Sequence, residues 1–221
     1  MKNYLQVYYS EKAKAYTGYP DKLCRYLAER FGISQGSRLI DVGCGRGEFL
    51  LGFQRAGCLA EGLDIRRYGG ALLEKFKIKT ANIERDRFPY EDESFDAVFS
   101  KSVIEHLHNP ENFLGECQRI LKLGGRLIVM TPDWQSQRYV FYSDHTHVQP
   151  YVELGLARVL DLYGFKEIET ELFYQLPLLW RHPWMKVALK PLRIILPIKR
   201  AQGNSFMRWS RELMILGTGI K

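Results

Sequence analysis

The sequence has little cysteine, and its apolar runs are short. The four cysteines among 221 residues are scattered and form no Cys-x-x-Cys pair, which argues against a disulfide framework or a cysteine-based zinc site. No stretch reaches the ~18 uncharged apolar residues of a membrane-spanning helix, and the polar N-terminus lacks a signal's apolar core. We therefore expect a cytoplasmic protein with reduced thiols.

Acidic residues are missing from one long segment near the C-terminal end. Residues 172–211 contain eight Lys or Arg and no Asp or Glu, although the whole chain carries a net charge of only +7. The remaining residues are close to neutral, with 24 basic and 25 acidic side chains. This asymmetry predicts a cationic segment attached to a neutral body.

Short apolar runs alternate with helical patterns along most of the chain. Strands are predicted at 38–42, 59–64, 95–100, 126–131, 165–173 and 212–216, and helices at 21–31, 48–56, 110–121 and 151–163. Strands that alternate with helices of ~10–15 residues predict an α/β fold, in which helices cover both faces of a doubly wound parallel sheet.

The same patterns divide the chain into four parts. We predict a helical N-terminal cap at 1–35, a core at 36–174, a basic apolar insert or lid at 175–211, and the last strand at 212–221. Within the core, Gly124-Gly125 is predicted to form a turn, and residues 135–149 are predicted to form a long loop.

A glycine-rich turn follows the first predicted strand. Gly43, Gly45 and Gly47 stand between this strand and a helix, where glycine lets a ligand lie against the backbone and the helix start offers free N–H groups. Asp64 ends the next strand, 17 residues after Gly47, and its carboxylate is placed to accept hydrogen bonds from ribose hydroxyls. A dinucleotide site is the alternative, but it favours Gly-x-Gly-x-x-Gly, and Asp41 would repel a pyrophosphate.

These features resemble the class I methyltransferases that use S-adenosylmethionine (SAM). The first motif of that family resembles residues 41–47, its second-strand acid corresponds to Asp64, and its adenine-side motif resembles Asn82-Ile83, where the family usually has Asp. Residues 88–98 and 120–127 are also typical, so the resemblance covers about residues 36–170.

The resemblance implies a fold, a cofactor and a set of cofactor-binding residues. The fold is a Rossmann-like sheet of seven mostly parallel strands with one antiparallel strand, to which we add a helical insert before the last strand. The cofactor is SAM, which leaves as S-adenosylhomocysteine. The cofactor-binding residues are predicted to be Asp41, Gly43, Cys44, Gly45, Gly47, Asp64, Ile65, Asn82, Ile83 and Ser100.

Four of the five histidines form two His-x-His pairs, and each pair follows a predicted strand of the core. Transfer of a methyl group to a hydroxyl benefits from a base near neutral pH, for which histidine is the usual choice. We predict His147 as the base or acceptor ligand, oriented by Asp144, and His106 as the second candidate. The alternatives are that His147 caps the next helix and that His106 shapes the cofactor pocket.

A divalent metal bound by Asp144, His145 and His147 is a further alternative. Adjacent loop residues rarely suffice without further ligands. We therefore expect a site without a metal.

The pattern around Asp144 and His147 resembles methyltransferases that modify sugars and polysaccharides, in which a similar Asp-x-x-His precedes a helix ending in Gly-Phe, here Gly164-Phe165. It implies O-methylation of a sugar, a glycan or a related small hydroxylated metabolite. Residues 100–103 lack the Asn/Asp-Pro-Pro-aromatic motif of enzymes that methylate bases, which argues against a nucleic-acid substrate. The basic segment nevertheless permits RNA binding. The alternatives are an RNA or protein methyltransferase and a SAM-binding regulator without activity.

Residues 176–200 combine tryptophans, leucines, cations and prolines. Apolar anchors beside cations suit the surface of an anionic membrane, and the prolines divide the segment into short helices. We predict peripheral contact with the inner face of a membrane, which would give access to a lipid-linked glycan. A cover over the active site or a homodimer interface is the alternative.

Overall fold

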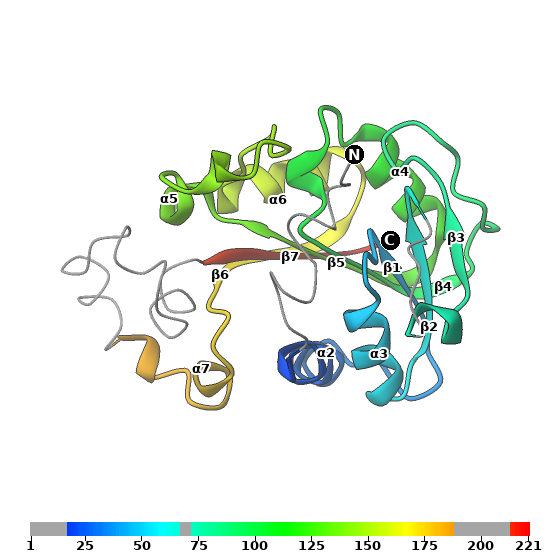
Figure 1. The fold of residues 1–221 in the computed structure, drawn as a ribbon, viewed down its shortest axis with the longest axis horizontal. Coiled ribbons are helices and arrows are strands. Elements are labelled where there is room, and N and C mark those ends of the chain that lie inside the picture. Colours follow the sequence, from blue (N-terminus) through cyan, green and yellow to red (C-terminus); the bar gives the residue numbers. More distant parts are fainter. Residues whose placement is uncertain (1–16, 67–71, 188–212) are drawn as a thin grey trace.

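The computed structural model describes residues 17–66, 72–187 and 213–221, and these residues build around one seven-stranded sheet (Figure 1). The strand order is β3-β2-β1-β4-β5-β7-β6. The strands are β1 (Arg38–Val42), β2 (Leu59–Asp64), β3 (Ile78–Thr80), β4 (Phe95–Lys101), β5 (Leu121–Pro132), β6 (Lys166–Phe173) and β7 (Met214–Ile220). The seven-stranded α/β fold predicted from the sequence is thus confirmed.

One strand runs against its neighbours. The pairs β1–β2, β1–β4, β2–β3 and β4–β5 are parallel, whereas β7 is antiparallel to both β5 and β6. In register, Arg126 of β5 faces Ile220 of β7, and Glu169 of β6 faces Thr218. The single antiparallel strand implied by the family resemblance is therefore β7.

Helices lie on both sides of the sheet (Figure 1). One side carries α2 (Tyr19–Arg30), α3 (Glu48–Arg55) and α7 (Pro177–Arg181), and the other carries α4 (Glu111–Ile120), α5 (Trp134–Gln137) and α6 (Glu153–Leu162). Three single-turn 3-10 helices, η1 (Leu73–Lys75), η2 (Ile104–His106) and η3 (Phe141–Ser143), interrupt the connections. Because helices cover both faces, four of the five residues of β1 are buried, as expected for a parallel strand.

Apolar side chains spaced for one helix face make the largest core cluster. In α4, Phe113, Leu114, Cys117 and Ile120 are fully buried, a spacing that turns one helix face toward the sheet. They pack together with Leu156 and Leu160 of α6. A second cluster on the opposite face joins α2 and α3 to β4, β5 and β7.

The predicted turn at Gly124-Gly125 lies inside β5, which begins already at Leu121. Gly124 has a φ of +74°, and the pairing of β5 with β4 shifts register between Leu121 and Arg126. The backbone N–H of Gly124 donates to the carbonyl of Lys221, and the N–H of Lys221 donates to the carbonyl of Gly125. The pairing with the end of the chain therefore continues past the glycines, where a sequence pattern indicates only a break.

Other boundaries also differ from the sequence prediction. The predicted loop 135–149 contains α5 and η3, and α5 begins where the carboxylate of Asp133 accepts a hydrogen bond from the N–H of Ser136 at 2.8 Å. The short strand β3 was not predicted, and β7 extends beyond the predicted 212–216 to Ile220. Three residues in β3 carry too little pattern to mark a strand.

Parts of the predicted cap and insert fall outside the described residues, namely 1–16 and 188–211. Within the described part, α2 packs against α3, and α7 continues the chain after β6. No helix in the described ranges has the length and apolar character needed to span a membrane.

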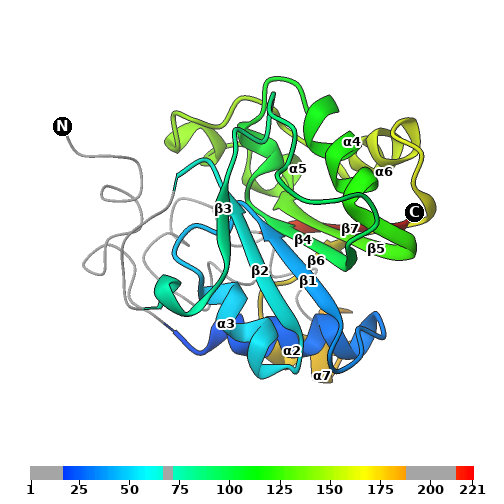
Figure 2. The ribbon, with the colours of Figure 1, turned by 90° about the vertical axis from the view of Figure 1, so that its right-hand side faces the viewer.

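The parallel strands bring four loops to one edge of the sheet. Because β1, β2, β4 and β5 point the same way, the segments that follow them meet at their carboxyl ends (Figure 2). Ligands of open α/β sheets bind in this region. The glycine turn, Asp64 and both predicted histidine pairs follow these four strands.

Candidate functional site

Two buried carboxylates lie at the ends of neighbouring strands. Asp41 in β1 is 2% exposed, and Asp64 at the end of β2 is 8% exposed. The Oδ2 atom of Asp41 has no hydrogen-bond partner within the described protein. Burial, and then the nearby charge of Asp64, raise the pKa of Asp41 well above its usual range. Among the residues that the structure describes, no cation pairs with either carboxylate, and a positively charged ligand would stabilise the pair.

The glycine turn after β1 has no room for a side chain at position 43. Gly43 has a φ of +83°, and a Cβ atom there would lie 2.2 Å from the Cγ2 atom of Val103. The N–H groups of Gly43 and Cys44 both donate to the carbonyl of Leu63, at 2.7 and 3.1 Å. The positive φ and the close approach of Val103 both require glycine at position 43.

Asp64 is held in place by the same turn. Its Oδ2 atom accepts a hydrogen bond from the N–H of Gly45 at 2.9 Å. Because a carboxylate oxygen has two lone pairs, this bond fixes the side chain and leaves capacity for ligand hydroxyls. Burial raises the pKa of Asp64 above its ordinary value, and the backbone N–H of Gly45 opposes that rise.

Two residues predicted to bind the cofactor use their side chains within the protein. The Cys44 thiol is 5% exposed and packs with Leu50 and Phe76. The Ser100 hydroxyl is 1% exposed and donates to the carbonyl of Val42 at 2.9 Å. A contact between either residue and a cofactor stays a prediction. Because both side chains already have structural roles, such a contact would involve their backbone atoms more readily than their side chains.

The predicted adenine side is apolar and partly open. Ile65 follows Asp64 directly and is 53% exposed, whereas Ile83 is half-buried against the core. The Oδ1 atom of Asn82 accepts a hydrogen bond from the N–H of Glu84 at 3.0 Å, so it closes its own turn. The role of Asn82 toward the adenine amine stays a prediction that relies on the second lone pair of Oδ1.

These features fit SAM, the cofactor that the sequence resemblance implies. The orphaned oxygen of Asp41 suits the ammonium of the methionine part, and Asp64 suits the ribose hydroxyls. The exposed side chain of Ile65 offers an apolar surface for the adenine ring. The glycine turn lies between these groups in the sequence and bonds directly to Asp64 through the N–H of Gly45.

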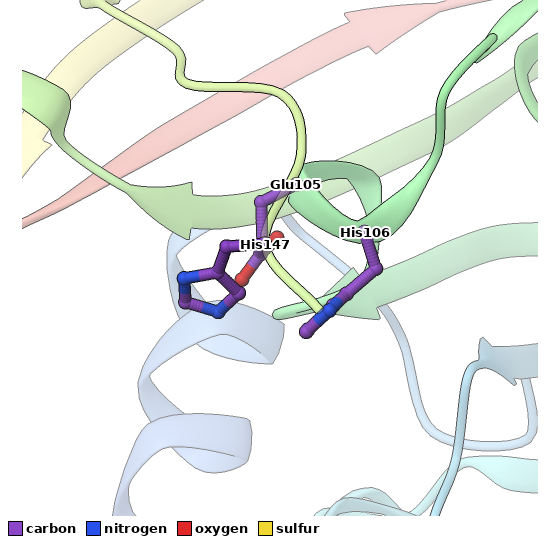
Figure 3. A group of neighbouring side chains, drawn as sticks. All are labelled: Glu105, His106 and His147. Carbon is purple, nitrogen blue, oxygen red and sulfur yellow. The ribbon is translucent and has the colours of Figure 1, made fainter. Parts of the chain in front are cut away.

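A cluster of three side chains forms after β4 and β5. Glu105 and His106 belong to η2, and His147 comes from the loop before α6 (Figure 3). The rings of the two histidines have centroids 4.7 Å apart. The loop is fastened to η2 because the N–H groups of Val148 and Gln149 both donate to the carbonyl of Glu105, at 2.9 and 3.0 Å. The structure thus brings together one histidine from each predicted pair.

Asp144 is connected to His106 through hydrogen bonds of the Thr146 hydroxyl. The Oδ1 atom of Asp144 accepts from the hydroxyl of Thr146 at 2.6 Å, and this hydroxyl lies 2.9 Å from the Nδ1 atom of His106. The Nδ1 atom of His147 lies 2.7 Å from the carbonyl oxygen of Phe141. The sequence pattern predicts that Asp144 orients His147 and marks no role for Thr146, because bonds between two loops carry no spacing signal.

The structure also shows where the other histidine of each pair lies, and whether His147 caps a helix. His108 and His145 are exposed. The helix α6 begins at Glu153 and has Val152 at its N-cap, with no side-chain cap. His147 is therefore not a helix cap, and its ring is available to the cluster.

The pKa values of Glu105 and His106, the two residues that η2 contributes, are shifted in opposite directions. Glu105, which was not predicted as a site residue, is fully buried, and burial raises its pKa to about 7. Burial, followed by the nearby ring of His147, lowers the pKa of His106. The imidazole of His106 is consequently neutral at pH 7 and able to accept a proton or bind a cation.

A cavity of about 600 Å³ opens elsewhere, beside Arg38 at the start of β1. It therefore lies at the sheet edge opposite the glycine turn. Its cationic lining includes Arg38 and Lys77, which both pair with Glu61. Because the cavity lies away from the glycine turn and from both carboxylates, we assign no ligand to it.

Comparisons with known proteins show the family and agree with the fold. A family model described as a methyltransferase domain matches residues 14–170. A ubiquinone biosynthesis O-methyltransferase of Alkalilimnicola ehrlichii is 30% identical over 123 residues, which are 52% of this chain and 50% of that protein. A demethylmenaquinone methyltransferase of Tropheryma whipplei is 29% identical over 140 residues, or 62% of this chain and 55% of that protein. The chain thus spans about half the length of these curated relatives.

Solved structures share the architecture. A SAM-dependent methyltransferase from Archaeoglobus fulgidus superposes with a TM-score of 0.66 over 99% of this chain and 100% of that chain, at 21% identity. At this level of identity the likeness concerns the fold alone.

Replacement of Asp41 by Asn should have opposite effects on stability and on ligand binding. A carboxyl whose pKa is raised by folding contributes stability below pH ~4 that is lost as the pH rises through the folded pKa. At pH 7, D41N should therefore raise the melting temperature of the ligand-free protein by about 2–8 °C, as expected for ~1–2 kcal/mol. SAM affinity should fall about 10–100-fold, because the partner of the ammonium is weakened.

Thermal denaturation between pH 4 and 8 and calorimetric titration with SAM measure the two effects. The stability gain should grow as the pH rises. An unchanged SAM affinity together with a lower melting temperature would contradict the role given to Asp41.

Replacement of Gly43 by Ala should disrupt the turn, because the new methyl group meets Val103 and the backbone needs a positive φ. We expect a loss of stability on the order of 2 kcal/mol and no measurable SAM binding. Gly115 provides the control, since it lies in α4 with nothing within 4 Å of its added Cβ. G115A should stabilise the protein by about 0.5–1 kcal/mol and retain SAM binding. Equal effects of the two variants in denaturant titrations would refute this account of the turn.

Proposed function

Because this chain belongs to the methyltransferase-domain family, we propose that it transfers a methyl group from SAM to a hydroxyl oxygen of a small organic acceptor. When bound, SAM supplies an activated methyl group, which an acceptor oxygen attacks in line while sulfur keeps the bonding electrons. The observation that carries the proposal is the Glu105–His106–His147 cluster, which stands at the same sheet edge as Asp41 and Asp64. The cluster provides groups that can bind and deprotonate an acceptor, whereas the two carboxylates provide groups that can bind the cofactor.

One residue, Val103, links the cofactor turn to the cluster. Val103 precedes η2, and its side chain packs against Gly43. Two and three residues further along the chain, Glu105 and His106 belong to the cluster. An acceptor that touches His106 or His147 is therefore held next to the glycine turn, which favours the alignment that a displacement reaction needs.

The cluster can receive the proton of an acceptor hydroxyl. His147, predicted as the base, and His106, predicted as the second candidate, each present an imidazole to the same space. Asp144 acts as a positioning residue, because it holds the Thr146 hydroxyl that contacts the ring of His106. In this proposal the imidazoles remove the hydroxyl proton as the oxygen bonds to the methyl carbon.

The acceptor is proposed to be a hydroxylated sugar or glycan unit, on the sequence pattern that links Asp144 and His147 to sugar-modifying enzymes. A hydroxylated ring on a lipid-borne acceptor is the second candidate, since the relatives named above include a ubiquinone biosynthesis O-methyltransferase and a demethylmenaquinone methyltransferase. Both candidates are small and carry a hydroxyl, so they use the cluster in the same way.

Membrane contact through residues 176–200 remains part of the proposal, in a narrower form. Leu179 is 1% exposed, and the ring of Trp180 stacks on Tyr26 with centroids 5.0 Å apart, so both pack on the protein body. Trp184 and Val187 are 72% and 69% exposed and are free to meet a lipid surface. Residues 188–200 lie outside the described part of the chain.

Replacement of His147 by Ala should reduce methyl transfer about 10²–10⁴-fold and leave SAM affinity within about threefold, since the ring serves the acceptor. The measurement is incorporation of label from methyl-labelled SAM into the polysaccharide, lipid-linked and small-molecule fractions of a cell extract, with SAM affinity determined separately by calorimetry. Label in the polysaccharide or lipid-linked glycan fraction supports a glycan acceptor, and label in a quinone-containing lipid fraction supports the second candidate.

Two variants serve as controls. H108A changes an exposed histidine of the same segment and should keep full activity. D64A should weaken SAM binding while keeping turnover at saturating SAM. A wild-type protein that binds SAM and labels no fraction would overturn the proposed transfer and favour a regulator, whereas label in RNA or protein would overturn the small acceptor.

A further inference from the structure

We propose that Glu105, His106 and His147 bind a divalent first-row transition-metal cation. One carboxylate oxygen and one nitrogen from each ring lie within 4.8 Å of one another. Figure 3 shows the carboxylate beside the ring of His147, with His106 extending from the same turn as Glu105. The proposal replaces the sequence-based expectation of a site without a metal and differs from the Asp144–His145–His147 set considered there.

The first support is the state of Glu105. Its side chain is fully buried, its Oε2 atom accepts a hydrogen bond from the hydroxyl of Thr131 at 3.0 Å, and its Oε1 atom has no hydrogen-bond partner within the described protein. A buried carboxylate oxygen without a partner is unfavourable. A cation bound between Glu105 and the two rings would satisfy this oxygen.

The second support is the orientation of the two rings. The Nδ1 atom of His147 lies 2.7 Å from the carbonyl oxygen of Phe141, and the Nδ1 atom of His106 lies 3.2 Å from the carbonyl oxygen of Thr146. Because a carbonyl only accepts, each Nδ1 must carry the proton, and the lone pair of each neutral ring is then on Nε2. Metal-binding histidines are commonly fixed by such a bond from the other ring nitrogen.

A carboxylate supports one of these rings from further out. The hydroxyl of Thr146 lies 2.9 Å from the Nδ1 atom of His106 and donates to the Oδ1 atom of Asp144 at 2.6 Å. The chain from Asp144 through Thr146 to His106 resembles the carboxylate–histidine pairs that orient metal ligands. Asp144 thereby acts as a positioning residue, which orients the ring of His106 without binding the ion itself.

The donor set selects the kind of ion. Two imidazole nitrogens and one carboxylate suit Zn²⁺, Mn²⁺, Fe²⁺ or Co²⁺, whereas Mg²⁺ and Ca²⁺ prefer oxygen ligands. Bonds of about 2.0–2.2 Å require the three ligand atoms to approach one another more closely than the 4.8 Å within which they now lie. Three protein ligands leave at least one coordination position for an oxygen from outside.

The ion deepens the proposed function, and its catalytic role rests on that function. An acceptor hydroxyl at the open position would have its pKa lowered by the cation, so that its proton passes to water as the oxygen attacks the methyl carbon. The carbon–sulfur bond breaks, and sulfur keeps its electrons. With the ion bound, this route replaces the direct proton removal by the imidazoles proposed above, because His106 and His147 then act as ligands.

Binding of the ion can be measured without turnover. The full-length chain is freed of metal with a chelator, dialysed and titrated with Co²⁺, whose visible absorption reports ligand number, and with Zn²⁺ in competition with a chromophoric chelator. We expect one ion per chain, and at least tenfold weaker binding in E105Q and in H147A. H108A, which changes the exposed neighbour, should bind as the wild type does.

The possible outcomes distinguish binding of the ion from its role in methyl transfer. Substoichiometric binding by the wild type, or equal Zn²⁺ affinity in E105Q and H147A, would overturn the metal site. If E105Q does not fold, H147A decides the question, since its change is less buried. One ion per chain in a protein that transfers no methyl group would support the site and refute the proposed function. Methyl transfer that persists at full rate in metal-free protein would overturn the catalytic role of the ion.

Discussion

The structure depends on one electrostatic constraint, the presence of two buried carboxylates at adjacent strand ends. Asp41 and Asp64 are each less than a tenth exposed, and the charge of Asp64 adds to the burial that raises the pKa of Asp41. Folding alone leaves an oxygen of Asp41 without a partner. The rest of the molecule must be stable enough to hold this arrangement, and the two packed helical layers supply that stability. A cationic ligand would provide the partner that this oxygen of Asp41 lacks.

The second half of the site is coupled to the first through the backbone after β4. Ser102 adopts a φ of +59°, which is uncommon for a residue other than glycine, and its N–H donates to the carbonyl of Met130 at 2.8 Å. This bond ties the start of the turn to β5 and directs Val103 onto Gly43. The turn then delivers Glu105 and His106 to the acceptor side. One strained segment thus sets the distance between the cofactor turn and the cluster.

The sequence predicted those parts of the site that are local. The glycine turn, the acid at the end of the second strand and the alternation of strands and helices each leave a pattern within a few residues. The pairing of His106 with His147 depends on two loops 40 residues apart, and the bonds that set the ring orientations pass through Thr146 and Phe141. Neither residue has a spacing that marks it. For the same reason Trp180 suggested a membrane anchor, although it packs on α2.

The most direct test of the account is the proton balance of SAM binding. Calorimetric titrations in buffers of different ionisation enthalpy, between pH 5 and 8, report protons released as the ligand binds. Because the ammonium of SAM should lower the raised pKa of Asp41, the account predicts proton release on binding of SAM, and none on binding of 5′-methylthioadenosine, which lacks the ammonium. SAM binding without proton release at any pH, or equal release with both ligands, would contradict the account.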